Sequence, residues 1–230
     1  MQNIFAFGDS IMKGIVTNTT RIDEGSTKYV ISDSCFVNRV ELLKNVSIRN
    51  LSRFGSTVKG GLSNLDRHLK EISPGDKVVL EFGGNDCNFD WKAIAANPMG
   101  QHAPTVDLRQ FRELYAQVIE RVTSANAVPV LLSLPVLLPR RFFDFVSRGL
   151  NKDNILLWLG GDVSTISNWH EQYNIAVFKL ANKHGVSVID ISTVFLGRRN
   201  LCEYYCLDGM HPNEKGHALI AEAVLHAGLL

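Results

Sequence analysis

The segment Ile-Phe-Ala-Phe-Gly-Asp-Ser, residues 4–10, joins a short apolar run to a polar turn. Consecutive apolar residues that stop at a glycine are typical of a strand covered on both faces, as in a parallel sheet. In such sheets the ligand crevice lies beyond the carboxyl ends of the strands. The polar residues that follow this strand are therefore the first candidates for chemistry.

Four further apolar runs have the same character. They are short, rich in Val, Ile, Leu and Phe, and cover residues 47–51, 77–82, 128–134 and 186–191. Amphipathic helical patterns lie between or after them, at residues 108–125, 166–184 and 213–226. This alternation predicts an α/β fold, namely a three-layer α/β/α sandwich with a five-stranded parallel sheet. We expect a single domain over residues 1–230.

Two longer stretches, residues 87–105 and 136–162, are irregular in pattern. Both follow predicted strands, so they are expected at the ligand end of the sheet. Long loops at that end commonly shape a binding site.

Composition limits the classes of partner. The net charge is +1, which argues against nucleic acid and anionic membranes as partners. No apolar run reaches the roughly 18 residues of a membrane span. The N-terminus lacks a basic segment before an apolar stretch, so a cytoplasmic location is expected, with a signal already removed as the alternative.

The four cysteines form no C-x-x-C pair and no recognisable zinc site. Their number suits free thiols in a reducing compartment, with one disulfide left open as an alternative. The sequence therefore predicts no metal and no cofactor.

The residues that follow the predicted strands supply the parts of a serine hydrolase. Such an enzyme needs a nucleophilic hydroxyl, a base, a group that orients the base, and donors for an oxyanion. Ser10 follows the first strand, and Asp208 and His211 lie three residues apart, a spacing that places both on one face of a turn. Asn85 offers a side-chain amide, and Gly55 offers an unhindered backbone N–H.

These residues belong to four short blocks, in the order Gly8-Asp9-Ser10, Gly55, Gly83-Gly84-Asn85-Asp86 and Asp208-Gly209-Met210-His211. Together the blocks resemble those of the SGNH/GDSL hydrolase family and span nearly the whole chain. The bulky residue Phe54 before the second block departs from the family pattern.

The resemblance implies a flavodoxin-like SGNH hydrolase fold and esterase activity. It implies Ser10 as the nucleophile, His211 as the base and Asp208 as the residue that orients the base. It also implies an oxyanion hole made by the N–H groups of Ser10 and Gly55 and the side chain of Asn85.

The substrate is predicted less directly. Residues 83–91 are similar to those of carbohydrate-esterase-like members, so the expected reaction is hydrolysis of short-chain, acetyl esters on carbohydrate through an acyl-enzyme. The compact chain leaves few residues for a long acyl tunnel. The expected partner is a small-molecule ester, such as an acetylated sugar; the oligomeric state stays open.

Two alternatives remain. A lysophospholipase or thioesterase would use residues 136–143 as an acyl wall, and a non-catalytic carbohydrate-binding module would keep the fold without turnover. Phe89 and Trp91 fit either stacking on a sugar ring or packing in the core.

Other polar residues have structural interpretations. Asp9 is expected to accept hydrogen bonds from loop N–H groups, and Asp86 is expected to be a structural or turn residue rather than a catalytic acid. Asp190 is expected to cap a loop, and is the alternative acid for the histidine. His170 and His217 lie in amphipathic helical patterns and are expected at the surface.

Overall fold

The structure is a computed structural model and describes residues 3–17 and 28–230. Its central sheet has five strands: β1 (Ile4–Gly8), β4 (Ile48–Asn50), β5 (Lys77–Glu81), β6 (Val128–Leu132) and β7 (Ser187–Ile189). They lie side by side in the order β4-β1-β5-β6-β7, and every neighbouring pair is parallel. This confirms the predicted sheet. The order of strands reverses beside β1, and a reversal of this kind opens a crevice at the strands' carboxyl ends.

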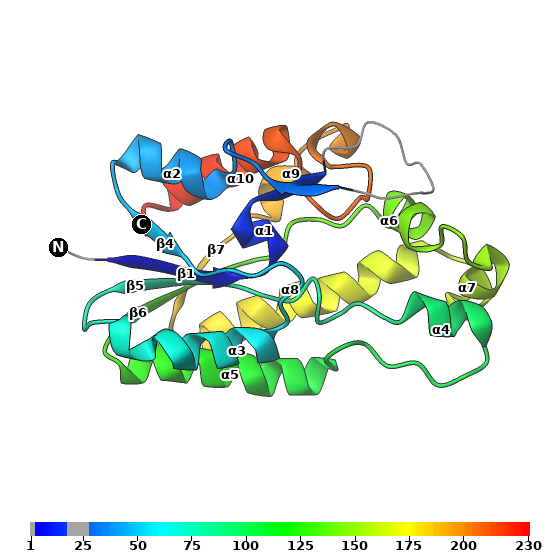
Figure 1. The fold of residues 1–230 in the computed structure, drawn as a ribbon, viewed down its shortest axis with the longest axis horizontal. Coiled ribbons are helices and arrows are strands. Elements are labelled where there is room, and N and C mark those ends of the chain that lie inside the picture. The colour runs from blue at the N-terminus through cyan, green and yellow to red at the C-terminus, as the bar shows by residue number, and fades with distance from the viewer. Residues whose placement is uncertain (1–2, 18–27) are drawn as a thin grey trace.

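Helices cover both faces of the sheet, which gives the three predicted layers (Figure 1). One face carries α2 (Phe36–Lys44), α9 (Thr193–Leu196) and α10 (Glu214–Ala227). The other carries α3 (Val58–His68), α5 (Leu108–Ser124) and α8 (Ser164–His184). Along β1 the side chains alternate between the two cores: Phe5 and Phe7 pack with the α5 layer, and Ile4 and Ala6 with the α10 layer.

The three predicted helices are α5, α8 and α10, and their bounds agree with the sequence pattern to within two residues. Capping side chains fix two of the starts. Asp107 accepts hydrogen bonds from Arg109 N and Gln110 N at the start of α5, and Asn213 does the same for Lys215 N and Gly216 N at the start of α10.

The two irregular stretches contain short helices at the carboxyl end of the sheet. Helix α4 (Trp91–Ala96) lies in the first stretch, and α6 (Pro139–Val146) and α7 (Lys152–Trp158) lie in the second. They form a lobe at the right of Figure 1, beyond the strand ends, with a hydrophobic cluster of its own. Each is too short to give a clear helical period, so the sequence showed only that these stretches would shape the ligand end.

Several smaller elements were not predicted. A hairpin of β2 (Ile15–Thr17) and β3 (Tyr29–Ile31) follows α1 (Ser10–Lys13), and 3-10 turns lie at η1 (Leu69–Glu71) and η2 (Leu201–Tyr204). Three-residue strands carry almost no alternation in sequence. The hairpin matters because it brings Tyr29 to the candidate site.

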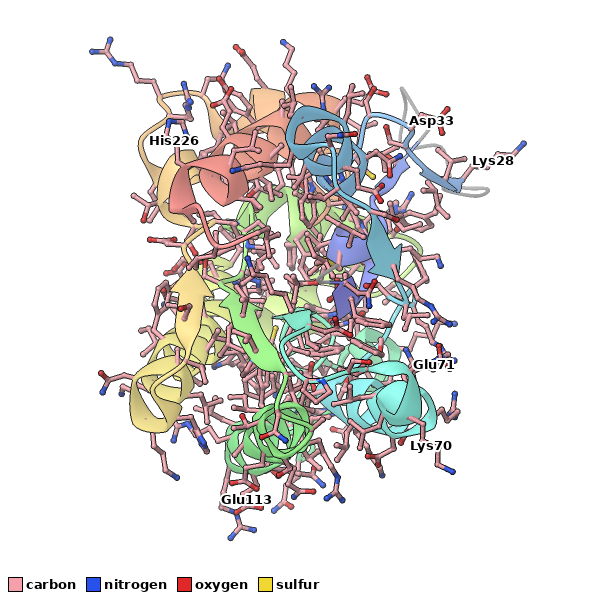
Figure 2. All side chains as sticks on the ribbon, turned by 90° about the vertical axis from the view of Figure 1, so that its left-hand side faces the viewer. Lys28, Asp33, Lys70, Glu71, Glu113 and His226 are labelled. Atoms are coloured by element: carbon pink, nitrogen blue, oxygen red, sulfur yellow. The ribbon has the colours of Figure 1, made fainter. Side chains whose placement is uncertain are left out.

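Charged side chains of both signs point outwards around the molecule. Figure 2 looks along the sheet from the end at which the strands begin, and the labelled residues Lys28, Asp33, Lys70, Glu71, Glu113 and His226 lie at the periphery. Over residues 3–17 and 28–230, none of the helices combines the length and the apolar character that a membrane crossing needs.

Candidate active site

Ser10 lies directly after β1, as the first residue of α1. The side chain of Asp9 accepts a hydrogen bond from Ile11 N at 2.8 Å and so caps this short helix. A Cβ at Gly8 would lie 2.5 Å from Met12 Cβ, so only glycine allows the turn to close so tightly. The serine is thereby held in a fixed, buried position.

Ser10, His211 and Asp208 form a continuous hydrogen-bonded chain. Ser10 Oγ lies 2.8 Å from His211 Nε2, and His211 Nδ1 lies 2.7 Å from Asp208 Oδ2. All three side chains are buried. The structure therefore brings together the three residues singled out in the sequence, in the arrangement of a Ser-His-Asp triad.

Asp208 is held as a carboxylate. Burial opposes its ionisation, but the His211 ring and the N–H groups of Met210 and His211 donate to it and keep its pKa below the usual value. Gly209 lets the loop pass close to α6, since a Cβ there would lie 2.6 Å from Arg141 Cβ. Its φ of +70° also favours glycine.

Two aromatic rings also contact the His211 ring. The Phe54 ring stacks nearly parallel to His211, with centroids 6.2 Å apart, and the Tyr29 ring lies 5.3 Å away. Burial, together with the negative charge of Asp208, raises the pKa of the Tyr29 hydroxyl. Sequence reasoning missed Tyr29 because nothing in its local pattern relates it to the triad.

The predicted oxyanion donors lie beside the serine. Asn85 Nδ2 donates to Asp9 Oδ2 at 2.8 Å and to Ser56 O at 3.2 Å, which links the loops after β1, β4 and β5. Gly55 occupies an exposed turn with φ of +70°. No residue described by the structure accepts a hydrogen bond from the backbone N–H of Ser10 or Gly55. Two donors are thus free, and the third is engaged by protein oxygens.

Asp9 forms a buried carboxyl pair with Glu81, the last residue of β5. Glu81 is fully buried, and its Oε2 accepts a hydrogen bond from Asp9 N at 3.4 Å. Burial, followed by the negative charge of Asp9, raises the pKa of Glu81 well above its usual value, so Glu81 carries the proton. In the sequence, Glu81 is the single acidic residue inside the apolar run 77–82. That run predicted a strand and indicated no role for the glutamate.

The two other acidic residues have structural partners. Both carboxylate oxygens of Asp86 accept from Val58 N, at 2.9 and 3.2 Å, and burial raises the pKa of Asp86 to about 7. Asp190 accepts from Ser192 N at 2.8 Å and from the N–H and hydroxyl groups of Thr193. Both expectations are confirmed, and the carboxylate that contacts His211 is that of Asp208.

The expectation of surface positions for His170 and His217 was wrong. Both are buried, and burial lowers the pKa of each to about 4, which keeps the rings neutral. His217 stacks on Phe36 and accepts a hydrogen bond from Phe36 N at 3.4 Å. A neutral imidazole can fill a core position, and a helical pattern that counts histidine as polar misses this.

An apolar pocket opens beside Ser10 and Asn85. Its walls come from the loops after β1, β5 and β6 and from α4, α6 and α8, with apolar side chains contributed by Ile11, Phe89, Trp91, Leu134, Leu137, Phe142, Ile166, Trp169 and Met210. Leu137 and Phe142 belong to the segment 136–143, which the sequence suggested as an acyl wall.

Packed aromatic rings line the pocket or contact its lining residues. Phe89 lies 4.8 Å from Trp169 and 5.0 Å from Trp158, and these two tryptophans are 4.9 Å apart. Trp91 is buried and packs edge-on against Phe142. Trp91 is thus a core residue that also lines the pocket, rather than an exposed stacking platform.

The cysteines and other ligating groups form no further centre in the part of the chain that the structure describes. All four cysteines are free thiols there. Within residues 3–17 and 28–230, no group of three or more His, Cys, Asp or Glu side chains is arranged to hold a metal ion.

Comparison with known proteins agrees with this geometry. The sequence pattern of the GDSL-like lipase/acylhydrolase family matches residues 6–219. The chain belongs to that family. This membership confirms the family resemblance drawn from the four sequence blocks.

A curated relative of this GDSL-family chain is the uncharacterized esterase YxiM of Bacillus subtilis. The two are 26% identical over 183 residues, which cover 76% of this chain and 40% of YxiM. The chain thus spans less than half the length of that relative.

Solved structures share the fold over nearly the whole chain. A lipolytic G-D-S-L family protein from Veillonella parvula superposes with a TM-score of 0.67 at 19% identity, covering all of both chains. A lipase/acylhydrolase from Enterococcus faecalis gives 0.65 at 18%, over 99% of this chain and 95% of that one. The acetyl xylan esterase AlAXEase gives 0.64 at 18%, over 98% of both. At these identities the likeness concerns the fold.

Proposed function

We propose that this chain hydrolyses short-chain carboxylic esters, with acetyl esters of carbohydrates as the substrate class. The observation that carries the proposal is the hydrogen-bonded chain from Ser10 through His211 to Asp208, which lies beside an apolar pocket.

The reaction has two steps. His211 Nε2 accepts the Ser10 proton while Oγ bonds to the ester carbonyl carbon, and the alcohol then leaves with the proton from His211. This yields the acyl-enzyme. Water, deprotonated by His211, attacks the acyl carbon and releases the acid, and the proton returns to Ser10. Asp208 accepts from Nδ1 throughout and stabilises the charged imidazolium.

The oxyanion would be held by the N–H groups of Ser10 and Gly55 and by Asn85. Asn85 can join only by exchanging its 3.2 Å bond to Ser56 O, because its shorter bond to Asp9 fixes the amide plane. Asp9 therefore acts as the support that orients this donor.

The acyl group would enter the apolar pocket. Phe89 and Trp169 line this pocket and pack against each other and against Trp158, so a longer acyl chain has to displace packed rings. This supports a short acyl group. A lipid-like acyl ester would also use the apolar wall with Leu137 and Phe142. The preferred acyl length therefore distinguishes a short-chain esterase from a lysophospholipase or thioesterase.

The first test concerns the nucleophile. Ser10→Ala should lower kcat for p-nitrophenyl acetate by about 10⁴-fold or more, and a fluorophosphonate probe should label the wild type but not this variant. Ser63→Ala, an exposed serine on α3, is the matched control and should keep both properties. Turnover that survives in Ser10→Ala, or a wild type without turnover, would favour another site or the non-catalytic module.

The second test concerns acyl length. kcat/KM should fall from p-nitrophenyl acetate to butyrate to octanoate, and Trp169→Ala should flatten this fall by opening the back of the pocket. A groove that accepts the chain would instead gain about 0.8 kcal/mol per methylene. A steady rise towards octanoate in the wild type would replace the short-chain proposal with the lysophospholipase or thioesterase alternative.

A further inference from the structure

An aromatic surface lies next to the histidine, and the acyl pocket does not include it. It consists of Phe54, in the turn after β4, and Tyr29, in β3, whose rings are 5.1 Å apart. Both contact the His211 ring, and neither lines the acyl pocket. The aromatic surface on the catalytic histidine is therefore distinct from the apolar pocket.

Phe54 has no role in the fold that would explain its position. Its relative exposure is 51%, and it is the sole aromatic residue among the large exposed hydrophobic side chains in the described part of the chain. It belongs to none of the three hydrophobic clusters. An exposed ring that contacts a buried catalytic histidine is a candidate for ligand contact.

The reaction fixes which part of the substrate meets this surface. The departing alcohol takes its proton from His211 Nε2, so the alcohol oxygen must lie close to that atom. With the acyl group in the pocket, the remainder of the alcohol extends from His211 along its other contacts. Those contacts are the rings of Phe54 and Tyr29.

We propose that Phe54, supported by Tyr29, binds the alcohol part of the substrate by stacking on a sugar ring. The inference rests on the proposed function and adds the residue that selects the alcohol. The C–H face of a pyranose can pack on the phenyl ring while its hydroxyl groups stay in water, which suits a half-exposed ring. An open-chain alcohol offers no such face.

The test compares two acetyl esters that form the same acyl-enzyme. The probes are a monoacetylated methyl xylopyranoside and ethyl acetate, and the readout is the ratio of their kcat/KM values, which reports acylation alone. Phe54→Ala should lower the ratio, sugar ester over ethyl acetate, by about three- to tenfold. Phe54→Trp should restore it, and Leu42→Ala, an exposed apolar residue on α2, should leave it at the wild-type value.

An unchanged ratio in Phe54→Ala would overturn the proposal, even where both kcat/KM values fall, because an equal fall means that Phe54 only positions His211. A failure of the proposed function looks different. In that case the wild type hydrolyses neither ester, or Ser10→Ala hydrolyses both as well as the wild type does.

Discussion

Two buried carboxyl groups flank the serine turn, and the structure gives them opposite protonation tendencies. Asp208 and Asp9 are almost equally inaccessible, with 1% and 2% of their surfaces exposed. The pKa of Asp208 is lowered despite burial, whereas burial raises the pKa of Asp9 and raises that of its partner Glu81 further. Burial therefore does not decide the charge of these groups.

The partner decides it. Asp208 faces a histidine that can become a cation and two backbone N–H donors, so its charged form is compensated. Asp9 faces a second carboxyl group, and two carboxylates in one dry site cannot both ionise, so one proton stays with the pair. The first arrangement supports proton transfer. The second holds Asn85 and the serine turn and carries one negative charge instead of two.

The largest expected effect comes from removing the charge of Asp208. Asp208→Asn should lower kcat by about 10³–10⁴-fold, because the amide no longer stabilises the imidazolium and can favour the wrong tautomer. Steady-state kinetics with p-nitrophenyl acetate measures this. The matched control is Asp190→Asn, which removes a loop-capping carboxylate on β7's carboxyl side and should cost stability rather than turnover. The reverse result would make Asp190 the triad acid.

An intermediate effect is expected at the contact between the carboxyl pair and the oxyanion donors. Asn85→Ala should lower kcat by about 10²–10³-fold with little change in KM, as for the loss of one oxyanion donor. Asn38→Ala, whose amide donates to Asp33 O at the surface, is the control and should behave as the wild type. A raised KM at unchanged kcat would make Asn85 a substrate-binding residue instead.

The smallest effect on rate is expected at Glu81, where a neutral side chain should raise stability at pH 8. Glu81→Gln keeps the shape of the protonated acid and its lack of charge, so kcat should change by no more than about threefold. The folded state holds a proton on Glu81 that the unfolded chain releases above pH of about 4.3. Wild-type stability should therefore fall as pH rises, by up to about 1.4 kcal/mol per pH unit for this proton.

Denaturant unfolding at pH 6, 7 and 8 tests the sign. Glu81→Gln should be more stable than the wild type at pH 8 and should lose less stability between pH 6 and 8. Some decline should remain because the raised pKa of Asp86, about 7, acts in the same direction. Parallel curves for the wild type and Glu81→Gln would show that Glu81 is ionised in the folded protein.

Much of the site was predictable because it depends on two local signals. Apolar runs predicted the five strands. The polar blocks that follow two of them predicted Ser10 and Asn85, and the block after the loop that follows the last strand predicted Asp208 and His211. Parallel strands end at one edge of the sheet, so residues as far apart as Ser10 and His211, 201 positions along the chain, meet there. The alternation of strands and helices was enough to infer that edge.

The sequence by itself therefore determined the α/β layers, the strand bounds to within two residues and the family to which the chain belongs. Windows of about ten residues are enough to predict these properties, because the hydrophobic period and the short motifs are local patterns.

Tertiary structure alone decided what surrounds the triad. Three features depend on how separate segments pack together. They are the raised pKa of Glu81 beside Asp9, the Tyr29 and Phe54 rings on His211, and the packed tryptophans at the pocket. The local sequence pattern does not predict such contacts, because each of these residues is common in a strand, a turn or a helix. Burial and the neighbouring group then fix its charge and its exposure, and both are properties of the folded chain.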